Sequence, residues 1–326
     1  MNDESDAPWW AGWPGRPLWW RFGRRTVLRL QGPDAVRYAN GQVTRDLRQA
    51  TCDRALAACV TTAKGQFQFL VSVSLAADGA VRVDGPADQA EALLARLDRY
   101  LIADDAELLA DPEWRDWSLH HLVGWQPDGV DLPPGVVRLQ SDRMGAAGWD
   151  LWCPPAAEQR LIEALRDVGP EGPMEVTDRS PASAAEFARI LLGVPAHGSE
   201  LDEKTLPPEA GLDRWTIDYR KGCYIGQEVL SRIYSVGRVN RKLVRLWGEA
   251  GGGVQPGDDL IDPGAGEGAS PVGRITSVAT HPQLDRLVAL AYVRRQALES
   301  PRLLGSGSGG DHRAVLHRIP DSFIVS

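Results

Sequence analysis

The sequence predicts an α+β fold that ends in a small antiparallel β-barrel. Two observations carry this prediction. From residue 21 to about residue 240, strand-like and helix-like segments are intermixed without a regular strand–helix–strand repeat. After about residue 245, short β-like runs alternate with Gly- and Pro-rich turns, which is typical of a small barrel.

Three segments follow from the same patterns. Residues 1–20 contain five of the twelve tryptophans among Gly and Pro and show no helical or strand period, so we expect an irregular N-terminal arm. Residues 21–240 are expected to form two α+β subdomains, and residues 241–326 are expected to form the barrel.

Hydrophobic periodicity and stop residues predict the elements in chain order. Alternating apolar side chains predict strands at 22–30, 67–75 and 81–83, the last two joined as a hairpin by the turn AADG. Helical periodicity predicts helices at 34–41, 88–101, 157–168 and 182–192, with Gly41, Gly169 and Gly193 as stops. In the barrel segment, LVRLWG, VGRITSV, LVALAYV and AVLHRIP predict strands, and GSGSGG at 305–310 predicts a flexible loop.

Composition excludes several classes of protein. The 43% hydrophobic and 25% charged contents are ordinary for a soluble globular chain. No apolar run approaches the ~18 residues of a membrane span. The first ten residues are acidic and lack the apolar stretch of a secretion signal, so we expect a cytoplasmic protein that binds no membrane. The net charge of −8 argues against a general nucleic-acid binder.

The charge is nevertheless uneven. Residues 214–245 contain eight Arg or Lys and two acids, a net charge of 8 − 2 = +6. An acidic protein with this local excess is expected to bind a small anion there. A solvated basic face is the alternative explanation.

The motif KGCYIGQE at 221–228 lies inside this basic stretch. Lys221 is one of only four lysines in the chain, so a compact ammonium beside the Cys223 thiol suggests a function. From Gly226 onward, QEVLSRI is expected to begin a helix, and both a helix N-terminus and positive charge favour a thiolate. We therefore take Cys223 and Lys221 as candidate catalytic residues. Two alternatives are an inert packing turn and a Cys–His hydrolase, although no histidine is near in sequence.

The motif, followed by Arg232, Gly237 and RVNRKL, closely resembles the signature of the YgfZ-type folate-binding proteins. These are relatives of the glycine-cleavage T-protein (aminomethyltransferase) and include mitochondrial iron–sulfur assembly homologues. Other segments that resemble the family are LQGPDAVRYANGQVTRDL at 30–47, AKGQ at 63–66, FARILLGVPAHGSEL at 187–201, LPPEAGL at 206–212, VGRITSV and LVALAYVRR. The resemblance covers roughly residues 22–320.

The resemblance implies a T-protein-like ring of three subdomains around a folate site, with residues 21–240 as the folate-binding domain and the motif loop at the site. It implies tetrahydrofolate or a derivative as cofactor. It also implies a role in making or maintaining iron–sulfur enzymes, with iron–sulfur assembly proteins or client enzymes as partners. The cofactor-binding candidates are Tyr38, Arg189, Tyr224, Gln227, Glu228 and Arg232. Aromatic walls would hold a flat pterin, and Arg side chains would pair with the anionic tail; Phe67, Arg220 and Arg238 are further candidates.

Two departures separate this chain from the T-protein. Its paired Asp residues align with Gln68 and Phe69, and because Gln cannot ionise, aminomethyl transfer by that route is not expected. Its pterin-binding Glu aligns with Leu191. Whether the chain is an enzyme therefore stays open. The alternative functions are a folate-dependent one-carbon (aminomethyl) transferase or demethylase, and an interaction module that docks a partner through its Trp-rich arm. No metal site is expected, because one motif cysteine cannot hold an iron–sulfur cluster that usually needs four thiolates.

Overall fold

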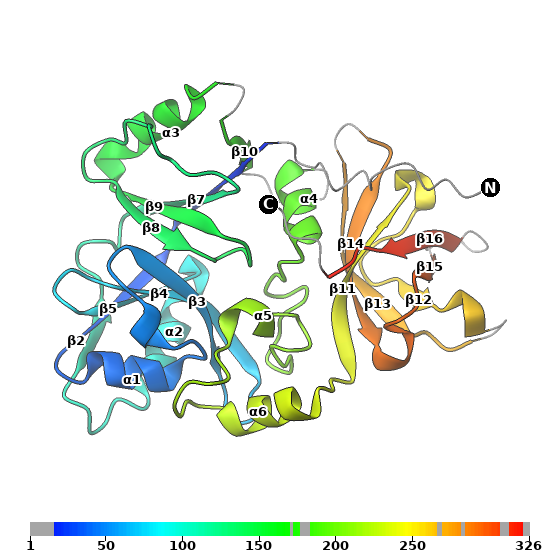
Figure 1. Ribbon diagram of the computed structural model, residues 1–326, viewed down its shortest axis with the longest axis horizontal. Helices are drawn as coiled ribbons and strands as arrows, with labels where there is room; N and C mark the ends of the chain where they lie inside the picture. Colours follow the sequence, from blue (N-terminus) through cyan, green and yellow to red (C-terminus); the bar gives the residue numbers. More distant parts are fainter. Residues whose placement is uncertain are drawn as a thin grey trace. The chain divides into compact units, whose positions relative to one another are not determined.

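The computed structural model of the chain is shown in Figure 1. The described residues are 16–169, 172–176, 183–265, 269–281, 284–306 and 313–321. The chain forms two compact units, and each is described by itself. Unit 1 comprises Met1–Thr177, Arg214–Ser231 and Val325–Ser326, and unit 2 comprises Asp178–Asp213 and Arg232–Ile324.

Unit 1 is built on a ten-stranded sheet in the order β10-β1-β7-β9-β8-β3-β4-β5-β2-β6. The strands are β1 (Leu18–Arg24), β2 (Thr26–Gln31), β3 (Arg54–Thr61), β4 (Phe67–Leu75), β5 (Val81–Gly85), β6 (Glu107–Ala110), β7 (Ser118–Val123), β8 (Val137–Ser141), β9 (Gly148–Cys153) and β10 (Met174–Val176). Strand β3 joins the two halves of the sheet, because it pairs in parallel with β8 and in antiparallel with β4.

Helices cover parts of this sheet. They are α1 (Ala35–Gln42), α2 (Ala90–Asp98) and α3 (Glu158–Arg166). Helices α1 and α2 bury Tyr38, Leu93 and Leu97 in one core with residues of β2 to β5. Helix α3 buries Leu161 and Leu165 in a second core with residues of β7 and β9. These two cores lie in different halves of the sheet, and a further cluster that includes Val27 of β2 and Leu119 of β7 spans both halves.

A buried ionic cluster joins the halves. The Arg143 guanidinium donates to both oxygens of Asp84 on β5, at 2.9 and 2.8 Å, and to both oxygens of Asp150 on β9, at 3.1 and 2.7 Å. Nδ1 of His121 on β7 lies 2.7 Å from Asp150. Arg25 adds a further ion pair to Asp84 at 3.0 Å. Because buried charges are tolerated only when they are paired, this cluster fixes how β5 and β9 meet.

Unit 2 contains a closed six-stranded barrel in the order β11-β14-β13-β12-β15-β16. Its strands are β11 (Arg241–Gly248), β12 (Asp259–Ile261), β13 (Gly273–Thr280), β14 (Leu287–Arg294), β15 (Arg302–Ser306) and β16 (Arg313–Arg318). Helix α4 (Ala184–Leu192) packs on β13 and β14. The two remaining helices are α5 (Asp213–Thr216) and α6 (Gln227–Val236). The sequence passes from unit 2 to unit 1 after Asp213, inside α5, and from unit 1 to unit 2 after Ser231, inside α6.

Most predicted elements are confirmed. The strand at 67–75, its hairpin partner and the helices at 157–168 and 182–192 are present, and Gly193 ends α4 with a positive φ of 74°. All four predicted barrel runs are strands. The loop predicted at 305–310 is in strand β15 for its first two residues, and the rest lies outside the described residues.

Several details were wrong. The strand predicted at 22–30 is two strands, because β1 ends at Arg24 on β7, whereas β2 begins at Thr26 and pairs with β5 and β6. The Trp-rich arm was expected to reach residue 20, but Trp19 and Trp20 are buried in β1; residues 1–15 lie outside the described residues. Helix α1 continues through Gly41. Helix α2 ends at Asp98, which leaves Tyr100 outside it and 42% exposed.

Candidate functional site

The motif loop, residues 221–226, enters helix α6 through a tight turn at Gly226. Cys223 is exposed and lies four residues before Gln227, the first residue of α6. Gly226 has a φ of +89°, a backbone conformation that residues with a Cβ rarely adopt. The turn therefore needs glycine, and it holds the thiol at the surface just ahead of a helix.

The loop packs directly on the Lys-Gly turn at 63–66. A Cβ on Gly226 would lie 2.6 Å from both Thr61 Oγ1 and Thr62 O, and 3.0 Å from the Cα of Gly65. A Cβ on Gly65, whose φ is +72°, would in turn lie 3.2 Å from Val229. The two segments that resemble family motifs are thus in contact, although about 160 residues separate them. Neither could carry a side chain at its glycine without moving the other.

The buried side chain of Lys221 holds the loop in place through hydrogen bonds. It is 5% exposed, and its Nζ donates to the carbonyls of Asn40, Val43 and Arg45 at 2.6, 2.7 and 2.6 Å. Two of these carbonyls lie at or just beyond the C-terminal end of α1, where the helix dipole favours a positive charge. A tetrahedral ammonium with three donors matches three converging carbonyls, whereas a planar guanidinium does not. This explains why a chain so rich in arginine has lysine here.

Burial lowers the pKa of Lys221 to about 8, while the carboxylates of Asp46 and Asp218 act to raise it. Its Nζ also lies 5.1 Å from the centre of the Tyr224 ring. Tyr224 is 7% exposed and packs with Ile217 and Leu230. Burial raises the pKa of the Tyr224 hydroxyl, which has no hydrogen-bond partner among the described residues. Both residues therefore anchor the loop rather than face solvent.

Backbone and side-chain hydrogen bonds complete the attachment. The Thr61 hydroxyl donates to Ile225 O at 2.6 Å, and Ile225 N donates to Gly41 O at 3.1 Å. Just before the motif, Asp218 accepts from the backbone N–H of Asp46 at 2.7 Å. Sequence reasoning missed these partners, because most of them are backbone atoms of residues that carry no chemical signal of their own.

Two predicted cofactor-binding residues are committed to internal contacts. Tyr38 is 6% exposed on α1, its hydroxyl donates to Leu97 O, and burial raises its pKa to about 12. Arg189 belongs to α4 in unit 2, where it donates to both oxygens of Glu186, to Glu200 at 3.2 Å and to Ser277 at 2.9 Å. Neither offers a free group to a ligand in this conformation.

The other three candidates lie on α6. Gln227 is half-buried, and its side-chain amide donates to Lys221 O at 3.5 Å. Glu228 and Arg232 are exposed, and neither makes an ion pair with another residue in the described part of the chain. The structure thus brings Lys221, Tyr224 and Gln227 together, and it leaves Cys223 and Glu228 exposed at the start of α6; Arg232 is exposed further along the helix.

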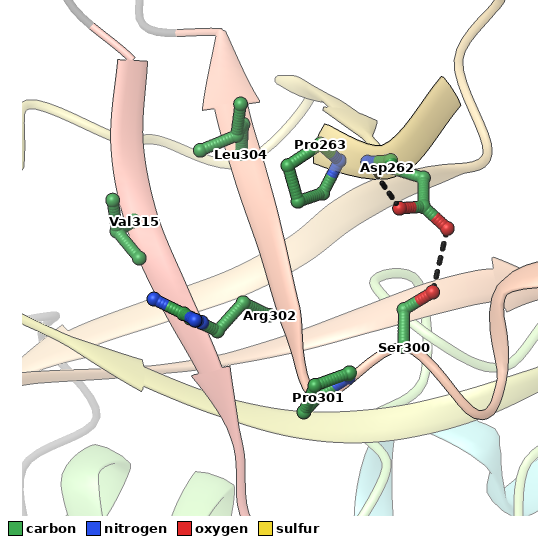
Figure 2. A pocket seen from close by; sticks show the side chains of 8 residues that line it. Asp262, Pro263, Ser300, Pro301, Arg302, Leu304 and Val315 are labelled. Carbon is green, nitrogen blue, oxygen red and sulfur yellow. Dashed lines mark hydrogen bonds between the residues drawn. The ribbon is translucent and has the colours of Figure 1, made fainter. Parts of the chain in front are cut away.

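A pocket of about 430 Å³ lies elsewhere, on the barrel of unit 2. Figure 2 shows it between Arg302 and Leu304 of β15, Val315 of β16 and the Asp262–Pro263 turn. Asp262 accepts from the Ser300 hydroxyl at 2.6 Å. None of the candidate residues predicted from the sequence lines this pocket.

We expect Lys221→Met to destabilise unit 1 by about 2–4 kcal/mol, because three buried carbonyls lose their donor. Lys221→Arg should also destabilise it, since the planar group cannot reach all three. Lys64→Met is the matched control: Lys64 is exposed in the neighbouring turn, and its loss should cost less than about 0.5 kcal/mol. Urea unfolding of the three variants measures this, and equal midpoints for Lys221→Met and Lys64→Met would remove the structural role of Lys221.

Comparisons with known proteins show what the chain is similar to. No protein-family model matches the chain. The chain is 28% identical over 233 residues to the mitochondrial iron–sulfur cluster assembly factor IBA57 homolog of Neurospora crassa, a match that covers 68% of this chain and 51% of that protein. It is 30% identical over 179 residues to the aminomethyltransferase of Streptomyces avermitilis, which covers 54% of this chain and 45% of that protein. The chain is a homologue of both groups. It spans about half the length of these curated relatives.

The fold agrees with this relationship. The crystal structure of glycine cleavage system aminomethyltransferase T from Bartonella henselae matches 95% of this chain and 86% of its own, with a TM-score of 0.73 and 17% identity. At that identity the likeness shows the fold alone. It confirms the resemblance in fold and the predicted α+β class with a C-terminal barrel. No helix among the described residues combines the length and apolar composition needed to cross a bilayer.

Proposed function

We propose that this chain is a cytoplasmic, tetrahydrofolate-binding accessory protein that supports the assembly or repair of iron–sulfur enzymes, with Cys223 at the folate site. The observation that carries the proposal is the motif loop: a buried lysine and two glycines hold one cysteine at the surface ahead of a helix. Homology to proteins named as iron–sulfur cluster assembly factors supports the same role.

The residues near the loop fit a reduced folate in part. Arg232 is exposed and is not committed to an internal carboxylate, so it is free to pair with the anionic tail. Gln227 and Glu228 offer an amide and a carboxylate to the hydrogen-bonding edge of a pterin. Tyr38 and Arg189 would first have to give up internal contacts. We therefore assign the folate contacts to the α6 residues and the chemistry to the exposed thiol.

The alternative, a one-carbon transferase, is supported by homology to proteins named as aminomethyltransferases. The side chain at 68 opposes it. Gln68 cannot ionise, and its oxygen accepts a hydrogen bond from Arg96 at 2.7 Å, so no free acid is available at that position.

Isothermal titration with 5-formyltetrahydrofolate tests the binding step. We expect saturable binding that Arg232→Gln weakens about three- to tenfold, because a charge-assisted hydrogen bond is lost. Arg54→Gln is the matched control, since Arg54 is an exposed arginine at the far end of β3 and should leave the affinity unchanged. Absence of heat and of any thermal shift at millimolar ligand would count against folate binding.

Complementation tests the cellular step separately. In a bacterial strain that lacks its own family member, the wild-type chain should restore iron–sulfur enzyme activity and Cys223→Ala should not. Because Cys223 is exposed, this variant should fold normally and still bind folate. Full rescue by Cys223→Ala would show that the thiol is not the functional group.

A further inference from the structure

A buried arginine outside the motif has an unusual set of partners. Arg96 on α2 is 8% exposed. Its Nε donates to Gln68 Oε1 at 2.7 Å, one terminal nitrogen donates to Gln42 Oε1 at 3.0 Å, and the other donates to Thr61 O at 2.9 Å. The ring centre of Tyr100 lies 4.9 Å from the guanidinium carbon. Every partner is formally neutral.

The charge of Arg96 is therefore uncompensated. No carboxylate of the described residues lies within ion-pair distance of Arg96, although other buried arginines of unit 1, such as Arg143, each contact at least one. Burial lowers the pKa of Arg96, in keeping with a cation held away from water. A buried charge without a counter-ion costs several kcal/mol, so the fold retains an unfavourable arrangement here.

The two glutamines add further donors. A guanidinium has only N–H donors, so each amide must turn its oxygen toward Arg96. The NH₂ groups of Gln42 and Gln68 are then left over as donors, and neither makes a hydrogen bond to any residue that the structure describes. Two N–H groups of Arg96 also remain after its three hydrogen bonds. The cluster thus presents donors and a positive charge, with its acceptors already used.

We propose that Arg96, Gln42 and Gln68 form a binding site for a small oxyanion, a carboxylate or phosphate group. The anion supplies the missing counter-charge and accepts hydrogen bonds from the free amide N–H groups. Gln68 is the half-buried member and gives the approach from solvent. This site uses none of the α6 residues to which the folate contacts are assigned.

Thr61 connects the proposed site to the motif loop through hydrogen bonds. Thr61 accepts from Arg96 through its carbonyl and donates through its hydroxyl to Ile225 in the loop. An anion that binds the guanidinium competes with its hydrogen bond to Thr61 O, at the end of the strand whose Thr61 hydroxyl holds the loop in place. This gives the oxyanion a direct structural route to the segment that carries Cys223.

NMR titration of the full chain, labelled with ¹⁵N in the glutamine side chains, tests the proposal. Sodium phosphate and sodium acetate are added separately at constant ionic strength. At least one of these two anions should shift the side-chain signals of both Gln42 and Gln68, and the shifts should saturate. The anion that binds more tightly identifies the anion class. Arg96→Met should abolish the shift. Arg99→Met, at an exposed arginine three residues along, should leave it intact.

Gln68→Glu gives an independent test, because it supplies a carboxylate from within the chain. This variant should no longer respond to either anion. In the wild type, an anion at ten times its Kd should raise the melting temperature by about 2 °C. Without anion, the melting temperature of Gln68→Glu should exceed that of the wild type by at least the same amount. The proposal fails if wild type shows no saturable shift up to tens of millimolar, or if Gln68→Glu responds as wild type does. Should Arg96→Met not fold, the comparison of wild type with Gln68→Glu still decides.

Discussion

Replacing Arg143 by methionine is expected to lower the free energy of unfolding by about 3–5 kcal/mol. The guanidinium makes four hydrogen bonds to Asp84 and Asp150, and neither residue is more than 5% exposed. Methionine fills a similar volume but leaves two like charges buried and close together. Because these carboxylates come from the two halves of the sheet, the loss should loosen the whole of unit 1 rather than one loop.

Arg138→Met is the matched control. Arg138 lies on neighbouring β8 but pairs with an exposed carboxylate, Asp128, so its loss should cost less than about 1 kcal/mol. Urea unfolding followed by tryptophan fluorescence compares the two variants. If both midpoints move equally, the buried cluster does not hold the halves together.

Acid should erase the difference between wild type and Arg143→Met. Burial acts to raise the pKa of Asp150, but Arg143 and His121 hold it well below its ordinary range. A carboxylate with a lowered folded-state pKa contributes stability above its unfolded pKa of about 3.9, and loses it as the pH falls toward the folded value. The gap between the two unfolding curves should therefore shrink below about pH 4.

Gly226→Ala is the second change with a large expected effect. The new methyl group would lie 2.6 Å from Thr61 Oγ1 and from Thr62 O, and the residue would be forced to keep a φ of +89°. Steric overlap and backbone strain together should cost about 2–5 kcal/mol, or displace the loop from the turn at Gly65. Either outcome changes the presentation of Cys223.

Gly222→Ala in the same motif separates this effect from a general intolerance of alanine. Nothing lies within 4 Å of a Cβ on Gly222, and its φ is not positive. It should unfold at the wild-type urea concentration and react with a thiol reagent at the wild-type rate. Gly226→Ala should differ from wild type in both measurements, and identical behaviour of the two variants would refute the contact between the glycines.

The sequence predicted local elements well because their signals are local. Alternation over nine residues specified β4, and Gly193 marked the end of α4. It predicted β1 and β2 as one strand because the change of partner strands at Arg25 does not interrupt the alternating pattern. It placed Trp19 and Trp20 in an arm because Gly and Pro precede them, whereas burial against the sheet makes them part of a strand.

The site was predicted in outline only. The motif loop and its glycines are identified from residue types. The role of Lys221, however, depends on backbone carbonyls almost 180 positions away, and backbone carbonyls leave no pattern in a sequence. The sequence predicts that Arg189 binds a ligand, yet Glu186 and Glu200 already form ion pairs with its guanidinium. Arg96 has a signal in the sequence, because an arginine between Leu93 and Leu97 on an apolar stripe is a detectable exception.

The attachment of Lys221 has a consequence for how the protein is made. Its three carbonyl partners precede it by 176 to 181 residues, and residues 178–213, between them, belong to the other unit. During synthesis the N-terminal part emerges first, so the end of α1 waits without its ammonium until nearly the whole of unit 1 has left the ribosome. A chain that ends before residue 221 lacks the ammonium that donates to these three carbonyls, so the end of α1 gains these hydrogen bonds only after the motif has been synthesised.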